Sequence, residues 1–417
     1  MGFDKNFIPV KPFNDFKWQW ASVQCTEGLN DPVILLGVLS KMANLEGKKY
    51  SSSEFSRELY YLHENIKDSV DTNIRLSERD GTRNIIRNSG QYWKALGLID
   101  DSSRGIIKLT PFGKKIALHD ISQAEFAATT IKTLKLPNSH IQSNDVCNQW
   151  HKHDLCLYPL MVILNILLNL SDVDQEGYIT TKELTQIIIP LSGVRAKIDD
   201  YVNFILWNRN NELDISEWPD CCPRANDKRM AREFLLFLQY YGYIKGYKDG
   251  ETANTKYYIV KILSDDIREL LKINKTTSDD FINQIRENGI ISDIERKRVL
   301  ASRIDRKGQR KFRSNILKAF NNKCLLTGVS IPEVLEAAHI KPVQYKGNDE
   351  TENGLCLRLD IHQLFDTGHL RISESGNIIL SQRVCSEYGT IIKNSIDIPD
   401  FINKQYIKWR WDNYNGI

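Results

Sequence analysis

The sequence R-K-F-R-S-N-I-L-K-A-F-N-N-K-C-L-L-T-G-V-S-I-P-E-V-L-E-A-A-H-I-K-P occupies residues 310–342, and N-G-L-C-L-R-L-D-I-H-Q-L-F-D-T-G-H follows at residues 353–369. His339 ends an apolar, strand-like run, and Asn353 opens a second one. His362 and Asp366 are four residues apart, so a helix would place both on one face. The stretch therefore predicts a strand, a loop, a second strand and a helix on which these polar groups converge.

These side chains suit the hydrolysis of a phosphodiester. A base must take a proton from water, and a cation must neutralise charge on the phosphate and on the leaving oxygen. His339 can act as the base because histidine titrates near neutral pH. His362 and Asp366 can share one divalent ion, and the amide of Asn353 can fix either the orientation of His339 or the returning loop. We interpret the stretch as a metal-dependent phosphodiesterase site.

The same residues resemble the HNH, or ββα-metal, nucleases, and in particular the subgroup with the pattern F-R, C-x2-T-G, A-A-H-I-x-P, N-G-L-x-L and H-x2-F-D-x-G. The matches occur in order at Phe312-Arg313, Cys324, Thr327-Gly328, residues 337–342, Asn353-Gly354-Leu355, His362, Phe365-Asp366 and Gly368. The resemblance implies that His339 is the general base, Asn353 the structural asparagine of the catalytic motif, and His362 a metal ligand. Asp366 is the second ligand by position, Mg²⁺ or Mn²⁺ is the expected ion, and no structural zinc is expected.

One position departs from the family pattern. Many relatives carry Asp or His directly before the general base as a metal ligand, whereas this chain has Ala338. Glu336 lies two residues back on the same face of the predicted strand and is a candidate third ligand. The alternatives are that Glu336 is a solvated charge and that Asp366 caps the turn after the helix. His369 is expected to be structural.

Two upstream segments share the order helix, helix, third helix and β-hairpin. In residues 14–120 an apolar helix over 32–44 is capped by Asp31, a second helix follows, and a third over 83–96 precedes two short strands. Residues 155–270 repeat this plan, with the third helix at 230–241 and a hairpin after it. The order is similar to that of the winged-helix superfamily, and the similarity is one of architecture.

The third helix of the first segment has a polar face of Arg, Asn and Gln, which pair with guanine and adenine in the major groove. A solvated amphipathic helix is the alternative. Residues 295–323 hold eleven Lys and Arg against two acidic residues, which suits a polyanion but also a solvated helix face. The residues that we expect to contact DNA are Arg83, Asn84, Arg87, Asn88, Gln91, Lys94, Arg310, Lys311 and Arg313.

A chain of 417 residues exceeds the size of a single core, so several domains are expected. We predict an α+β multidomain protein in which tandem winged-helix-like modules precede a C-terminal ββα-metal (HNH) nuclease domain. The predicted parts are residues 1–145 and 146–270, a charged helical connector at 271–308, and the nuclease domain at 309–417. No secretory signal or membrane span is evident, and the scattered cysteines fit reduced thiols, so a bacterial-type cytoplasm is expected.

Two further segments have metal-site features. Residues 172–183 approach the spacing of an EF-hand calcium loop, with a turn and a short strand as the alternative. Cys147, His151, His153 and Cys156 are zinc-type ligands, but their spacing matches no known finger and a single loop rarely supplies all four ligands.

The leading functional hypothesis is a sequence-specific endonuclease of double-stranded DNA that resembles type II restriction enzymes, especially those that cut outside their recognition sequence. One HNH site cuts one strand, so a transient or stable homodimer is a candidate arrangement for double-strand cleavage. The alternatives are a modification-dependent endonuclease and a DNA-binding regulator whose nuclease domain is inactive.

Overall fold

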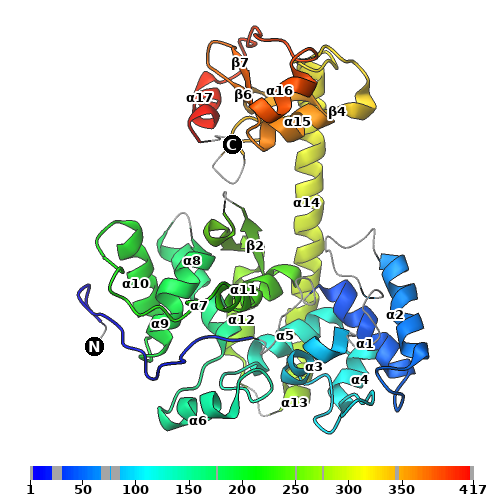
Figure 1. Cartoon of the computed structure of the whole chain (residues 1–417), viewed down its shortest axis with the longest axis vertical. Helices are drawn as coiled ribbons and strands as arrows, with labels where there is room; N and C mark the ends of the chain where they lie inside the picture. Colours follow the sequence, from blue (N-terminus) through cyan, green and yellow to red (C-terminus); the bar gives the residue numbers. More distant parts are fainter. Residues whose placement is uncertain are drawn as a thin grey trace. The chain divides into compact units, whose positions relative to one another are not determined.

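The computed structural model describes residues 3–20, 31–66, 76, 85–174, 177–248, 251–274, 277–342 and 347–413, and it describes only the backbone of 85–89 and 299–310. The chain forms two compact units, Met1–Arg298 and Val299–Ile417. Helix α14 (Ile290–Ala319) begins in the first unit and ends in the second (Figure 1). Within the described ranges, no helix combines the length and the apolar character needed to cross a membrane.

The first half of the first unit is helical. Helix α1 (Pro32–Asn44) begins as predicted, with the side chain of Asp31 accepting a hydrogen bond from the amide of Val33. Helix α3 (Ile85–Ala95) buries Tyr92 and Trp93. The two short strands predicted after it are reduced to a single antiparallel bridge between Ile99 and Leu109. The other helices here are α2 (Ser53–Ile66), α4 (Pro111–Ala117), α5 (Gln123–Thr133) and α6 (Asn144–Lys152).

The second half of this unit surrounds a three-stranded antiparallel sheet with the order β1-β3-β2. The strands and helices appear in the predicted order. They are α7 (Pro159–Val173), β1 (Tyr178–Thr180), α8 (Thr181–Glu183), a π-helical turn (Leu184–Ile188), α9 (Ile189–Ser192), α10 (Ile198–Arg209), α11 (Ala225–Tyr240), β2 (Ile244–Tyr247) and β3 (Lys256–Ile259). The identification of either half as a winged helix stays a prediction.

One hydrophobic core extends through the described residues of the first unit from Phe16 to Ile294. The ring of Trp20 lies 5.2 Å from that of Tyr92 in α3 and 4.3 Å from that of Phe234 in α11. Helices α12 (Ser264–Lys272) and α13 (Ser278–Glu287) also contribute buried residues. The contacts thus divide the chain once, between Arg298 and Val299, and the finer four-part division stays a prediction.

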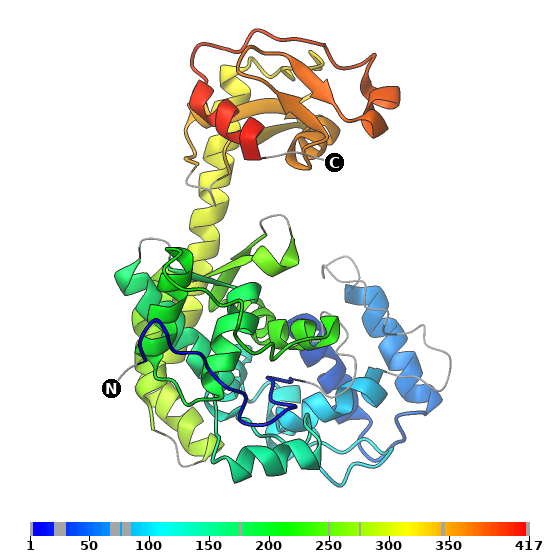
Figure 2. The same cartoon turned by 60° about the vertical axis from the view of Figure 1, so that its left-hand side comes forward.

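The second unit is built on an antiparallel hairpin of β4 (Leu335–His339) and β5 (Gly354–Arg358), and α15 (Leu359–Asp366) packs on both strands. The predicted order of strand, loop, strand and helix is therefore confirmed. A second hairpin, β6 (Leu370–Ile372) and β7 (Ile378–Leu380), leads to α16 (Gln382–Tyr388) and α17 (Lys404–Asn413). Helix α17 contacts β6 (Figure 2). The end of α14 adds Phe312 and Ile316 to the core, which also buries Cys324 and Cys356.

Candidate active site

His339 is the last residue of β4 and pairs with Gly354 of β5. A Cβ at Gly354 would lie 2.3 Å from the side chain of Ile316 and 2.7 Å from that of Phe312, so the missing side chain lets α14 approach the hairpin. The ring of Phe312 then stacks on the imidazole of His339, with centroids 3.9 Å apart and an interplanar angle of 10°. About a quarter of the His339 side chain remains exposed. The candidate base is thus held against a rigid aromatic face and still reaches solvent.

Asp349 is a partner of His339 that the sequence did not reveal. Its Oδ1 lies 2.9 Å from Nε2 of His339, and its own side chain is half exposed. A carboxylate in this position fixes the orientation of the imidazole and selects the tautomer that carries its proton on Nε2. The residue lies in the polar loop that precedes Asn353, where K-G-N-D-E-T-E reads as an ordinary solvated segment.

Asn353 fixes the loop between the two strands. Its side chain is fully buried. Oδ1 accepts a hydrogen bond from the amide of Lys341, and Nδ2 donates to the carbonyl oxygens of Lys341 and Asn348, each at 2.8 Å. A Cβ at Gly347 would lie 1.7 Å from the carbonyl oxygen of Lys341, so the loop closes tightly here. Two roles were expected for this amide, orientation of His339 or fixing of the returning loop. Its contacts are those of a residue that fixes the loop.

Glu336, His362 and Asp366 form a second polar group on the other face of β4. Strand residues three apart project to opposite faces, so Glu336 points toward α15 while His339 points toward α14. Nδ1 of His362 lies 2.7 Å from Glu336 Oε2, and its Nε2 lies 3.1 Å from Asp366 Oδ2. The predicted spacing of His362 and Asp366 on one helix face is confirmed.

The charges of these groups are coupled. Burial lowers the pKa of His362, but the hydrogen bonds and negative charges of Asp366 and Glu336 outweigh it and raise the pKa above its ordinary value of 6.5. Burial raises the pKa of Asp366, but His362 and Arg410 outweigh it and the net pKa lies below 3.8. The two flanking carboxylates therefore shift the equilibrium of His362 toward the imidazolium relative to an ordinary histidine.

The donors of this group suit a hard or borderline divalent cation, because imidazole nitrogen and carboxylate oxygen are its common ligands. The two carboxylates contact different nitrogens of one imidazole, so the three side chains do not face a single point. No set of three His, Cys, Asp or Glu side chains in the described parts of the chain is placed to hold a metal ion. A pair consisting of His362 and one carboxylate still fits Mg²⁺, which keeps several waters and often binds through few protein ligands plus substrate phosphate. The ligand set of His362, Asp366 and Glu336 stays a prediction.

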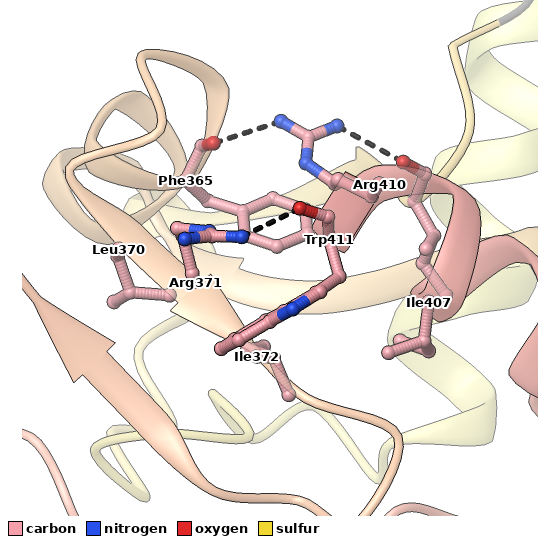
Figure 3. Close-up of a pocket in the computed structure, with 8 residues that line it drawn as sticks. Phe365, Leu370, Arg371, Ile372, Ile407, Arg410 and Trp411 are labelled. Atoms are coloured by element: carbon pink, nitrogen blue, oxygen red, sulfur yellow. Dashed lines mark hydrogen bonds between the residues drawn. The ribbon is translucent and has the colours of Figure 1, made fainter. Parts of the chain in front are cut away.

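Arg410 of α17 is the second residue that the sequence did not reveal. Its side chain is 5% exposed and donates to the carbonyl oxygens of His339 and Ile340 and of Phe365, and to Oδ1 of Asp366. Figure 3 shows the bond to Phe365. Its partners lie 44 to 71 residues earlier in the chain, so no local pattern marks it.

The residues expected to contact DNA are only partly described. Arg83 and Asn84 lie outside the described residues, as do the side chains of Arg87, Asn88 and Arg310. Gln91 and Lys311 are exposed, and Lys94 donates to the carbonyl oxygen of Asp101.

Arg313 is exposed and donates to the carbonyl oxygens of Pro332 and Leu335, which supports the start of β4. DNA contact by all nine residues stays a prediction. His369 bonds Ser381 through Nδ1, in agreement with a structural role.

The described acidic side chains of the EF-hand-like segment form ion pairs with arginines. Arg268 contacts Asp172 at 2.7 Å, and Arg209 contacts Glu183 at 2.7 Å and Asp174 at 3.4 Å. Glu183 also completes a capping box with Thr180. These contacts fit the turn and capped helix offered as the alternative to a calcium loop.

Comparison with known proteins agrees with this geometry. Residues 324–373 match the family model described as HNH endonuclease, so the chain contains an HNH endonuclease domain. The match covers the hairpin, α15 and the first strand of the next hairpin, and it includes His339, Asn353 and His362.

Two further comparisons add little to this assignment. No curated protein matches the chain in sequence. A solved structure, the crystal structure of pyrene- and phenanthrene-modified DNA in complex with the BpuJ1 endonuclease binding domain, is similar at 14% identity. The similarity covers 67% of this chain and 97% of that one with a TM-score of 0.44, which does not establish a common fold.

Proposed function

We propose that the protein is a sequence-specific endonuclease of double-stranded DNA, similar to type II restriction enzymes, which hydrolyses phosphodiester bonds with one divalent metal and a histidine base. The observation that carries the proposal is the setting of His339 at the end of β4. It is stacked on Phe312, bonded to Asp349 and followed by a loop that Asn353 closes. This arrangement belongs to the HNH endonuclease domain that the family match identifies.

The chemistry assigned to this chain starts at His339. When Nε2–H donates to Asp349, Nδ1 keeps the lone pair and can take a proton from the attacking water. Phe312 and Asp349 hold the ring so that no reorientation is needed as the proton moves. A divalent cation bound at His362 and one of its carboxylates would neutralise charge that builds on the phosphate and the leaving oxygen. Magnesium or manganese is the proposed ion.

The test is cleavage of plasmid DNA with Mg²⁺ or Mn²⁺ by the full chain and two histidine variants. His339→Ala should lower the cleavage rate by about 10²–10⁴-fold, because a positioned general base contributes that much. His369→Ala is the matched control, since it removes a histidine of the same domain whose side chain bonds Ser381, and it should cut at the wild-type rate. Absence of cleavage of any DNA by the wild-type chain would refute the proposal.

The same assay separates the alternative functions. Cutting confined to plasmid from a methylating host would identify a modification-dependent enzyme. Specific band shifts without cleavage would identify a DNA-binding regulator. A cleavage rate that rises with more than the first power of protein concentration would support a homodimer for double-strand cleavage.

A further inference from the structure

Arg410 spans the two elements that hold the candidate catalytic groups. Its Nη1 donates to the carbonyl oxygens of His339 and Ile340, both at 3.0 Å, at the end of β4. Its Nη2 donates to the carbonyl oxygen of Phe365 and to Oδ1 of Asp366, both at 2.8 Å, at the end of α15. The guanidinium also lies 3.8 Å above the ring centroid of Phe365. The Arg410 side chain thus contacts both the main chain at His339, the candidate base, and the carboxylate of Asp366, which pairs with His362.

The chemistry of the guanidinium explains why an arginine suits this place. Its planar fork presents several N–H donors in fixed directions, so the separation of its acceptors is fixed as well. Lysine would bring a point charge on a flexible stem and would fix that separation poorly. Burial of a charged group costs free energy. If the only role of this residue were to pack α17 against α15, an apolar side chain would do so without that cost.

We propose that Arg410 is a positioning residue that sets the distance between His339 and the His362–Asp366 pair, so that α17 is part of the active site. The inference rests on the proposed function. Helix α17 lies beyond the residues matched by the HNH family model, and that match therefore does not assign it. Arg410 touches neither water nor phosphate in this role, and it acts through the groups it holds.

A neighbouring arginine offers a matched control. Arg371 of β6 donates to the carbonyl oxygen of Trp411 at 2.6 Å, and its guanidinium lies 4.0 Å above the Trp411 ring (Figure 3). It lines the same pocket as Arg410 and contacts the same helix, but these contacts are to Trp411 and not to a candidate catalytic residue. Loss of Arg371 should therefore loosen α17 without moving His339 or Asp366 directly.

The experiment compares full-length Arg410→Gln, Arg410→Lys and Arg371→Gln with the wild type. In Arg410→Gln, kcat for plasmid cleavage should fall about 10²-fold at nearly constant KM, because displacement of about 1 Å in an active site costs that much. Mn²⁺ affinity should fall about tenfold, as is typical when a residue that orients a ligand is lost. Arg410→Lys should recover part of both losses. Arg371→Gln should lower the melting temperature but leave kcat and Mn²⁺ affinity near the wild-type values.

Amide hydrogen exchange gives a readout that needs no activity. Exchange at residues 339–341 and 365–368 should rise in Arg410→Gln relative to Arg371→Gln. Equal losses of kcat in these two variants, corrected for the folded fraction, would overturn the proposal.

If the wild type cuts no DNA, the proposed function fails by itself, and Mn²⁺ affinity and amide exchange decide the role of Arg410. If Arg410→Gln does not fold, the folded Arg410→Lys carries the comparison, and wild-type kcat and Mn²⁺ affinity in it would count against the proposal.

Discussion

Two buried carboxylates of the first unit pair with arginines of other helices, whereas two buried polar side chains of the second unit bond mainly to the main chain beside the candidate active site. Arg209 of α10 contacts Glu183 of α8, and Arg286 of α13 contacts Glu125 of α5. In the second unit Asn353 and Arg410 bond backbone groups next to His339. The difference implies that polar substitutions in the first unit should act on stability, and those in the second on both stability and cleavage.

The largest effect on stability is expected for Asn353→Ala. The amide of Lys341 and the carbonyl oxygens of Lys341 and Asn348 would lose a buried partner, which should lower the free energy of unfolding of the second unit by about 3 kcal/mol. Calorimetry with separate transitions for the two units measures it. Asn377→Ala, at an exposed residue of an isolated β-bridge, is the control and should cost less than about 0.5 kcal/mol. If Asn353→Ala also shifted the unfolding transition of the first unit, the proposed difference between the two units would be wrong.

Arg209→Met is the corresponding change in the first unit. The Arg209 side chain is 15% exposed, and its loss leaves the carboxylate of Glu183 without its ion pair, which should lower the stability of the first unit by about 2 kcal/mol. Urea unfolding measures the change, and kcat at saturating DNA should stay unchanged. Removing Glu183 as well, as Glu183→Gln, should recover part of the loss. Arg195→Met removes an exposed ion pair with Asp154 and should have little effect. A fall in kcat in Arg209→Met would show that polar side chains of the first unit also affect cleavage, contrary to the proposed difference between the units.

The smallest effect concerns acid stability. Burial raises the pKa of Glu125, but the hydrogen bond from Arg286 and the amide of Ser122 outweigh it, so the folded pKa lies below 4.5. A depressed carboxylate pKa stabilises the fold above its unfolded value, and this stabilisation is lost as the pH falls through the folded pKa.

Glu125→Gln should therefore flatten the decline of stability of the first unit below about pH 4.5, as measured by urea unfolding at several pH values. The acid response of the second unit should not change. An unaltered pH profile of the first unit would show that the ion pair contributes nothing measurable.

Much of the second unit could be predicted because its signals are local. Short apolar runs mark the two strands of the hairpin, and the spacing of four between His362 and Asp366 places both on one face of α15. In the first unit, Asp31 and Pro32 predicted the start of α1 at the right residue. The two strands expected after α3 reduce to one bridge between Ile99 and Leu109, and Ile107 exchanges backbone hydrogen bonds with Gly47 and Lys48 instead.

The sequence by itself determined that this chain carries an HNH endonuclease unit, since the identity and the spacing of His339, Asn353 and His362 suffice for that. Only the tertiary structure decided how these residues are supported. Asp349 reaches His339 through a loop, and Arg410 reaches β4 from 71 residues away. Such tertiary contacts join residues that are distant in the sequence, so residue spacing along one helix or strand cannot predict them. The arrangement of Glu336 and Asp366 on different nitrogens of His362 was decided in the same way.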